Sequence, residues 1–111
     1  MAIGIVNEIN FQEEVIEKGG PAMIIFSAVW CGPCKQLSKV VESIMPDLET
    51  KITIRKVMVD DSPKLSNDFG VRSIPTTIFM HNGEEVSRIM GSQNQRRILT
   101  CIDQLFAKGY A

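Results

Sequence analysis

The chain has 111 residues, of which 44% are hydrophobic and 23% are charged. This composition excludes a disordered chain, and the length fits one domain, so we expect residues 1–111 to form a single domain. The formal net charge is -1 and no basic patch stands out, which argues against binding to nucleic acid. The longest apolar run, residues 22–26, has five residues and is too short to cross a membrane.

The first ten residues have neither a positively charged start nor a long apolar stretch, so no secretory signal is predicted. Of the three cysteines, two form a Cys-x-x-Cys pair and the third is remote. An odd number with one close pair is typical of a reducing compartment, in which the pair is catalytic or binds metal. We therefore expect a cytoplasmic protein.

The first half of the chain predicts two helices and one central strand. Asn10 is the predicted N-cap of a helix over 11–18, and Met23–Phe26 predicts a strand that is buried on both faces. Apolar residues then recur every three or four positions up to about Thr50, which predicts an amphipathic helix. Pro46 lies inside that helix and is expected to kink or weaken it.

The second half predicts three more strands and two helices. A strand over 52–59 precedes a short helix with Ser62 as its cap and Pro63 in its first turn. Strands over 76–80 and 85–90 are joined through Asn-Gly, which is a strong hairpin signal, and 94–108 predicts a last helix.

The order of these elements predicts an α/β fold. Its centre is a mixed sheet of four strands, or of five if residues 3–6 add one more. Parallel strands come first, an antiparallel hairpin comes last, and helices cover both faces.

The sequence Trp30-Cys31-Gly32-Pro33-Cys34 lies between a strand end and a helix start. Free N–H groups and the helix dipole favour an anion there, so the pKa of Cys31 is expected to fall from about 8.5 towards 7 or below. Cys34 lies one turn later, within reach of a disulfide and deeper in the helix. Cys31 is therefore predicted to attack a partner disulfide, and Cys34 to release the reduced partner. The Gly32-Pro33 turn holds the two sulfurs in place.

The cysteine pair has two other interpretations. Cys-x-x-Cys is also half of a zinc site, but tetrahedral zinc needs two more ligands, and only His81 and Cys101 are left, without metal-ligand spacing. No metal is therefore predicted. The pair could also be inert and buried, which the neighbouring Trp, Gly and Pro disfavour. For Cys101 we predict a small buried thiol, the alternative being an exposed regulatory thiol.

Several segments together resemble the thioredoxin family over nearly the whole chain. They are Phe26–Lys35, Lys56–Asp60, Phe69–Thr76, Asn82-Gly83-Glu84 and Gly91. The resemblance implies a thioredoxin fold and a dithiol–disulfide oxidoreductase that reduces protein disulfides without a bound metal or organic cofactor. It also implies disulfide-containing protein substrates and a thioredoxin reductase as electron donor. We expect a monomer.

The resemblance also implies how the site is arranged. Pro75 would be cis and would face the Cys31 sulfur, while the Ile74 backbone would pair with an extended partner segment. Asp60 would hold the Trp30 indole by a hydrogen bond. Ser73 stands where glycine is common in the family and is expected to narrow or polarise the docking groove. The docking surface would consist of Trp30, Gly32, Pro33, Ile74, Pro75 and Gly91.

One departure from the family pattern concerns the resolving half of the reaction. Many thioredoxins have a buried aspartate where this chain has Ile25, beside a lysine that Lys56 matches. Without that acid, deprotonation of Cys34 is expected to be slower or to depend on water or another group. Lys56 is expected to turn towards solvent or to approach the active-site thiolate.

Two functional hypotheses follow. The first is a reductant, because Gly32-Pro33 resembles the reducing members of the family rather than the oxidising ones. The second is a binding module in which redox turnover is incidental, a hypothesis to which Ile25 gives some weight.

Overall fold

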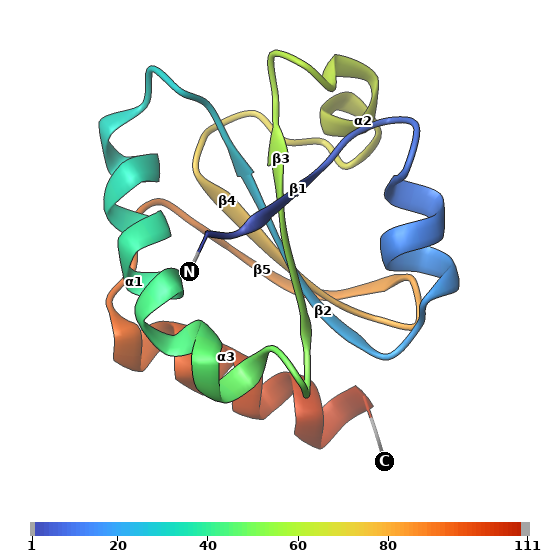
Figure 1. The fold of residues 1–111 in the computed structure, drawn as a ribbon, viewed down its shortest axis with the longest axis vertical. Helices are drawn as coiled ribbons and strands as arrows, with labels where there is room; N and C mark the ends of the chain where they lie inside the picture. The colour runs from blue at the N-terminus through green and yellow to red at the C-terminus, as the bar shows by residue number, and fades with distance from the viewer. Residues whose placement is uncertain (1, 110–111) are drawn as a thin grey trace.

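Five strands form one mixed sheet in the computed structural model, which describes residues 2–109. The strand order across the sheet is β1-β3-β2-β4-β5 (Figure 1). β1, β3 and β2 are parallel, whereas β4 is antiparallel to β2 and β5 to β4. The α/β fold predicted from the sequence is confirmed, with the fifth strand present.

In chain order the elements are β1 (Gly4–Val6), the π-helical segment η1 (Gln12–Glu17), β2 (Pro21–Ser27), α1 (Gly32–Leu48), β3 (Thr53–Met58), α2 (Pro63–Asp68), β4 (Thr76–His81), β5 (Glu84–Met90) and α3 (Gln95–Gly109).

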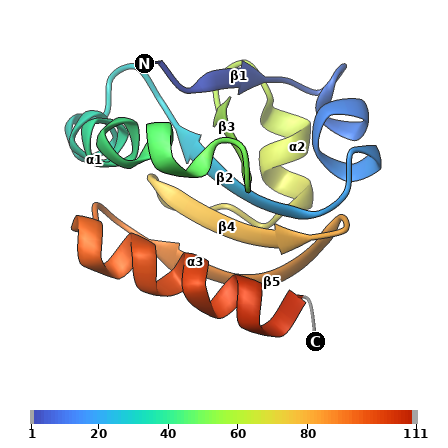
Figure 2. The same cartoon turned by 60° about the horizontal axis from the view of Figure 1, so that its bottom comes forward.

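Helices cover both faces of the sheet, as predicted. α1 and α3 pack on one face, and η1 and α2 on the other (Figures 1 and 2). Figure 2 shows α3 lying along the part of the sheet that β4 and β5 form. The sheet therefore has two separate apolar cores, one on each side.

Strand β2 supplies side chains to both cores. All seven of its residues are buried. Met23 and Ile25 pack in the α1/α3 core, whereas Ile24 and Phe26 pack in the η1/α2 core. Successive side chains of a strand point to opposite faces, so a central strand with helices on both sides needs apolar residues throughout.

The β4–β5 hairpin turns at Asn82 and Gly83, which have φ of 51° and 83°. Two positive φ angles are what the usual two-residue hairpin turn requires, and Asn-Gly is the pair that adopts them most readily. A Cβ on Gly83 would lie 3.0 Å from a methyl group of Ile16, so the turn also needs glycine for its space. The Asn82 side chain accepts the Gly20 N–H at 2.7 Å and ties the hairpin to the start of β2.

The start of the first helical segment differs from the sequence prediction. Asn10 does not cap a helix over 11–18. Its Oδ1 instead accepts the Asn7 N–H at 2.8 Å, while the Asn7 Oδ1 accepts the Asn10 N–H at 3.2 Å. This reciprocal pair is a capping box that begins three residues earlier than predicted. The helical turn therefore starts at Asn7, and η1 follows it as a π-helical segment with no side-chain cap of its own.

The cap of α2 was also predicted incompletely. Ser62 occupies the N-cap position, but its Oγ is buried and has no hydrogen-bond partner among the described residues. The Leu65 N–H instead donates to the Glu8 carboxylate at 2.8 Å. Glu8 lies in the loop after β1, far away in sequence, so the helix is capped by a tertiary contact.

Arg88 joins β5 to the end of α2. Its guanidinium donates to the Phe69 carbonyl at 2.8 Å and to the Glu85 carboxylate at 2.6 Å. The hydrogen bond from Arg88 holds the pKa of Glu85 below its usual value. The bond therefore stabilises the fold above the usual carboxyl pKa, and the stabilisation is lost as the pH falls through the lowered one.

Helix α1 continues through Pro46 and ends at Leu48. Pro46 lies in the last turn, so the hydrogen bond that it removes affects only the end of the helix. Within residues 2–109, no helix is long and apolar enough to cross a membrane.

The Glu8 cap can be tested by substitution. Glu8→Ala removes the acceptor of the Leu65 N–H and should lower the free energy of unfolding by about 0.5–2 kcal/mol, the usual cost of losing an N-cap. Urea denaturation would measure the change. Glu17→Ala removes an exposed carboxylate with no described side-chain hydrogen bond and should change stability much less. Equal effects of the two substitutions would contradict the assignment.

Candidate active site

The two cysteines of the pair lie where β2 passes into α1. This position is at the carboxyl ends of the parallel strands, the edge at which open α/β sheets place their sites. Cys31 is the N-cap residue of α1, with extended backbone angles, and its Sγ accepts the Cys34 N–H at 3.2 Å. The cysteine sulfur thus takes one of the free N–H groups of the first helical turn.

Cys31 and Cys34 form a disulfide, with their Cα atoms 5.3 Å apart. The separation is within the usual range for disulfides. Cys31 is 6% exposed and Cys34 is 1% exposed, so Cys34 is the more buried of the two, as predicted. A partner molecule therefore reaches the Cys31 sulfur more readily.

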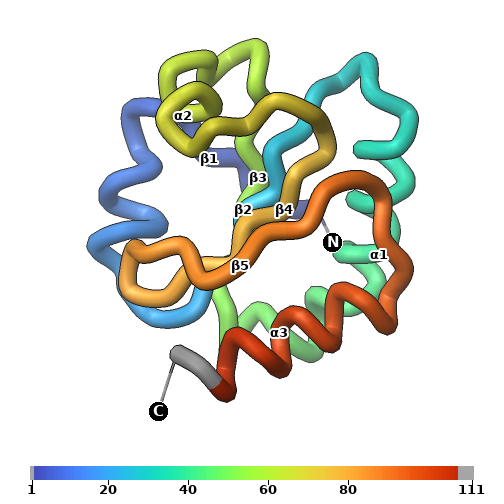
Figure 3. The backbone as a smooth tube through the Cα atoms, turned by 180° about the vertical axis from the view of Figure 1, so that it is seen from behind, coloured from blue at the N-terminus to red at the C-terminus, as the bar shows by residue number. Residues whose placement is uncertain are grey.

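The loop before β4 faces this disulfide. The Ile74–Pro75 peptide bond is cis, and the Ile74 carbonyl oxygen lies 4.0 Å from the Cys31 Sγ. Two hydrogen bonds fix the loop: the Thr76 hydroxyl donates to the Ser73 carbonyl at 2.6 Å, and the Gly91 N–H donates to the Pro75 carbonyl at 2.8 Å. Figure 3 shows the loops before α1, β4 and α3 gathered at one edge of the molecule.

Trp30 stands beside the disulfide and is 66% exposed. Its indole Nε1 donates to the Asp60 carboxylate at 2.7 Å, which is the hydrogen bond expected from the sequence. Asp60 follows β3, so the contact joins the ends of two neighbouring parallel strands. Val29, which is 72% exposed, and Met90, which is 64% exposed, add apolar surface at the ends of β2 and β5.

Sequence reasoning missed two features of this region. Thr76 fixes the Ile74–Pro75 loop through its hydroxyl, and Met90 exposes an apolar side chain next to Gly91. A threonine directly after the proline was a usable signal for the first. Nothing in the sequence indicated that Met90 is exposed, since methionines in strands are usually buried.

The comparisons with known proteins agree with this geometry. Residues 2–104 match the family model described as Thioredoxin. A protein named Thioredoxin from Rickettsia typhi is 37% identical over 99 residues, which are 89% of this chain and 94% of that protein. Proteins of the same name from Porphyra purpurea and Griffithsia pacifica are 37% and 33% identical, over 83% and 94% of this chain and 86% and 95% of their own lengths.

The chain belongs to the thioredoxin family. Its Cys31–Cys34 pair lies at the position and in the geometry of a thioredoxin dithiol. The protein is therefore a thiol–disulfide oxidoreductase with protein-disulfide reductase activity. Membership of the family implies disulfide substrates and reductase partners in general.

The position of the usual thioredoxin aspartate is fully apolar in this chain. Ile25 is 0% exposed and packs in the α1/α3 core with Leu37 and Val41. Its neighbour across the β2–β3 pair is Lys56, which is half-buried and has no ion pair among the described residues.

Lys56 and Cys34 both line an open cavity of about 530 Å³. We call it the Cys34 hollow. It is lined by Ser27, Ala28, Val29, Cys34, Lys35, Ser38, Lys39, Glu42, Lys56 and Met58. Lys56, which the sequence predicts to turn either to solvent or to the active-site thiolate, thus lines an open hollow that Cys34 also lines.

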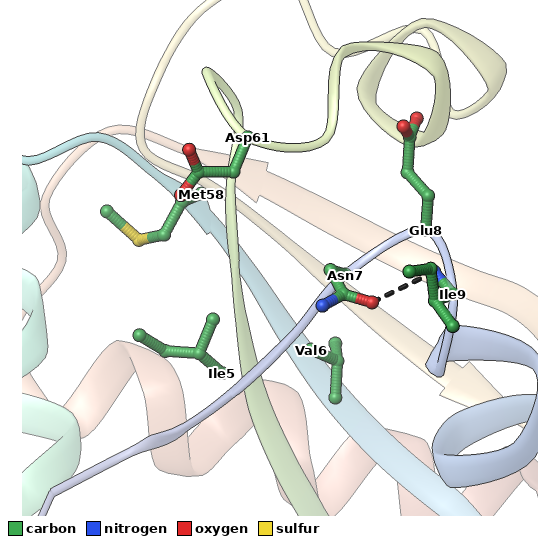
Figure 4. A pocket seen from close by; sticks show the side chains of 7 residues that line it. All are labelled: Ile5, Val6, Asn7, Glu8, Ile9, Met58 and Asp61. Carbon is green, nitrogen blue, oxygen red and sulfur yellow. Dashed lines mark hydrogen bonds between the residues drawn. The ribbon is translucent and has the colours of Figure 1, made fainter.

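A second cavity, of about 340 Å³, lies beside the edge strand β1 (Figure 4). Its walls are the residues of β1 and the following loop, together with Met58 and Asp61. Figure 4 shows the Asn7 side chain turned to the Ile9 N–H, the bond that closes the loop. The described residues that line this cavity include Glu8 but neither a cysteine nor a basic side chain.

The remaining candidate residues lie away from the dithiol. Cys101 is a buried free thiol in the α1/α3 core, as predicted. His81 ends β4 at the hairpin, at the opposite end of that strand from Pro75. Within residues 2–109, no group of three or more His, Cys, Asp or Glu side chains is placed to hold a metal ion.

The contact between Trp30 and Asp60 yields a prediction. Asp60→Ala frees the indole, which should weaken partner docking by about 0.5–1.5 kcal/mol, the usual net contribution of a hydrogen bond. Since about 1.4 kcal/mol is tenfold, kcat/KM for insulin reduction should fall about two- to tenfold. Asp61→Ala is the matched control, because Asp61 is the exposed neighbour and makes no described side-chain hydrogen bond. Equal rates for both variants would exclude a role for this contact.

Proposed function

We propose that Cys31 is the attacking cysteine and Cys34 the resolving cysteine of this reductase. The observation that carries the assignment is the position of Cys31 as the N-cap residue of α1. There its sulfur accepts a backbone N–H and is the more exposed of the two. An N–H donor and the positive end of the helix stabilise a thiolate, which is the reactive form.

The exchange then takes two steps. The Cys31 thiolate attacks one sulfur of the substrate disulfide, forms a mixed disulfide and expels the other substrate sulfur as a thiolate, which takes a proton from water. Cys34 loses its proton and attacks the Cys31 sulfur, so the Cys31–Cys34 bond forms and the first substrate sulfur leaves. The substrate gains two electrons, and the dithiol is oxidised to the disulfide seen in the structure.

We propose that an extended segment of the substrate docks across Ile74. The backbone of this residue lies against the Cys31 sulfur, so pairing with it would align the substrate disulfide for attack. The pairing leaves the apolar side chains of Trp30, Val29 and Met90 free to contact the partner. Gly32, Pro33, Ser73, Pro75 and Gly91 complete the proposed surface, with Lys56 and Asp60 as supporting residues.

The identity of the electron donor, the assembly and the location belong to the same proposal. A thioredoxin reductase is the donor that the family supports. We propose a single-domain monomer in the cytoplasm, which agrees with two continuous cores around one sheet and with three cysteines of which one is a buried thiol.

Substitution of each cysteine separates the two roles. Cys34→Ser should accumulate a mixed disulfide on Cys31 when the reduced protein meets oxidised substrate, because the resolving step is blocked. Cys31→Ser should abolish insulin reduction and trap nothing. Gel electrophoresis without reductant and mass spectrometry would locate the linkage. Trapping through Cys34 would reverse the assignment, and turnover without either thiol would refute it.

The reducing character gives a second prediction. Gly32-Pro33 resembles the turn of reducing family members, so the potential of the Cys31/Cys34 couple should lie below about −230 mV, the lower limit of the glutaredoxin range. Equilibration with glutathione or dithiothreitol buffers would measure it. A value near that of disulfide oxidants, about −120 mV, would show an oxidase instead.

A further inference from the structure

The resolving step needs a thiolate at a buried sulfur. Cys34 is 1% exposed and belongs to a small apolar cluster with Ala28 and Cys31, against which Val59 and Ile74 pack. Burial among apolar groups disfavours the charged form of a thiol, so Cys34 would remain protonated unless another group stabilises its thiolate. On the face of the sheet that α1 covers, β2 contributes Ile25, which can neither accept a proton nor donate a hydrogen bond.

Lys56 is the charged residue of β3 that lines the Cys34 hollow. It is the β3 partner of Ile25 in the parallel β2–β3 pair. Directly paired residues point to the same face of a sheet, and Ile25 points to the α1/α3 face. Lys56 therefore points to the side on which α1 carries Cys34, and both residues line the Cys34 hollow.

The charges around the hollow are mainly positive. α1 contributes Lys35, Lys39 and Glu42, β3 contributes Lys56, and the segment from the end of β2 to α1 contributes no ionisable side chain. None of these four is in an ion pair within the described part of the chain. Among the three lysines, Lys35 and Lys39 are exposed and screened by solvent, whereas Lys56 is half-buried like Glu42, so the charge of Lys56 is the least screened of the three.

Glu42 is the one acid among the lining residues and is poorly placed to serve as a base. It follows Cys34 by eight residues, which is about 12 Å along a helix that rises 1.5 Å per residue. The groups near the sulfur are thus better suited to stabilise a negative charge than to take up a proton.

We infer that Lys56 stabilises the Cys34 thiolate across the Cys34 hollow, so that this protein resolves its mixed disulfide by cationic stabilisation and not by a buried carboxylate base. The inference rests on the proposed role of Cys34 as the resolving cysteine. The Cys34 proton passes to water in the open hollow, the thiolate attacks the Cys31 sulfur, and the substrate sulfur leaves as a thiolate that water protonates. Lys56 takes no part in this proton transfer and acts as a positioning residue through its charge.

The test measures the pKa of Cys34 directly and, during turnover, the rate at which the reduced substrate is released. In the Cys31→Ser background, thiolate absorbance against pH reports the pKa of Cys34, after subtraction of the Cys31→Ser/Cys34→Ser protein to remove Cys101. Adding Lys56→Met should raise the pKa of Cys34 by about half a unit to one unit. In the protein with both active-site cysteines, Lys56→Met should slow release of the reduced substrate near neutral pH by about three- to tenfold, with the mixed disulfide persisting accordingly.

Three further variants separate charge from structure. Lys56→Arg keeps the charge and should restore most of the rate, and Lys64→Met removes a lysine on α2 outside the hollow and should leave rate and pKa unchanged. Glu42→Gln should speed the resolving step or leave it unaltered. A slower step in Glu42→Gln would identify Glu42 as the base and overturn the inference.

The failures of the two proposals are distinguishable. If Cys34→Ser traps no mixed disulfide, the assignment of Cys34 itself is wrong. If Cys34→Ser traps the mixed disulfide but Lys56→Met changes neither the pKa of Cys34 nor the rate of release, the role of Lys56 alone is wrong.

Discussion

The burial of β2 in the centre of the sheet is the constraint on which the site depends. The strand is buried at all seven positions, held by β3 on one side and β4 on the other, with a core above and below it. Its end is therefore fixed, and α1 begins five residues later. Cys31 reaches the N-terminus of the helix because the chain must turn there from a buried strand into a helix that covers it.

The same arrangement brings the other loops to the dithiol. β4 runs antiparallel to β2, so the start of β4 lies beside the end of β2, and the Ile74–Pro75 loop faces Cys31. β3 runs parallel to β2, so Asp60 follows its end and meets Trp30. Strand direction alone thus explains why residues from distant parts of the chain surround one disulfide.

In the proposed mechanism, different interactions stabilise the thiolates of the two cysteines. Cys31 uses the polarity of the backbone, which every helix start provides, and needs no particular side chain. Cys34 is inside the helix and buried, and in the mechanism that we propose it depends on a side chain that lines the same hollow, Lys56, which is paired with an apolar Ile25. In the proposed mechanism the attacking step is consequently set by the fold, whereas the resolving step can vary through single residues of β2 and β3.

The sequence by itself determined the element order, the mixed sheet, the position of the dithiol and the hairpin at Asn82-Gly83, because each depends on local periodicity, turn chemistry or one specific motif. Contacts between distant segments had no such local signal. The Glu8 carboxylate, 57 residues before Leu65, accepts the Leu65 N–H and so caps α2 in place of the Ser62 side chain. The Asn7–Asn10 box is a local contact, but it consists of two asparagines and not of the usual Ser or Thr with Glu or Gln, so the first helical turn starts three residues before the predicted cap. Only the tertiary structure decided that Lys56 and Cys34 share one hollow, since this follows from strand register and from how α1 packs on the sheet.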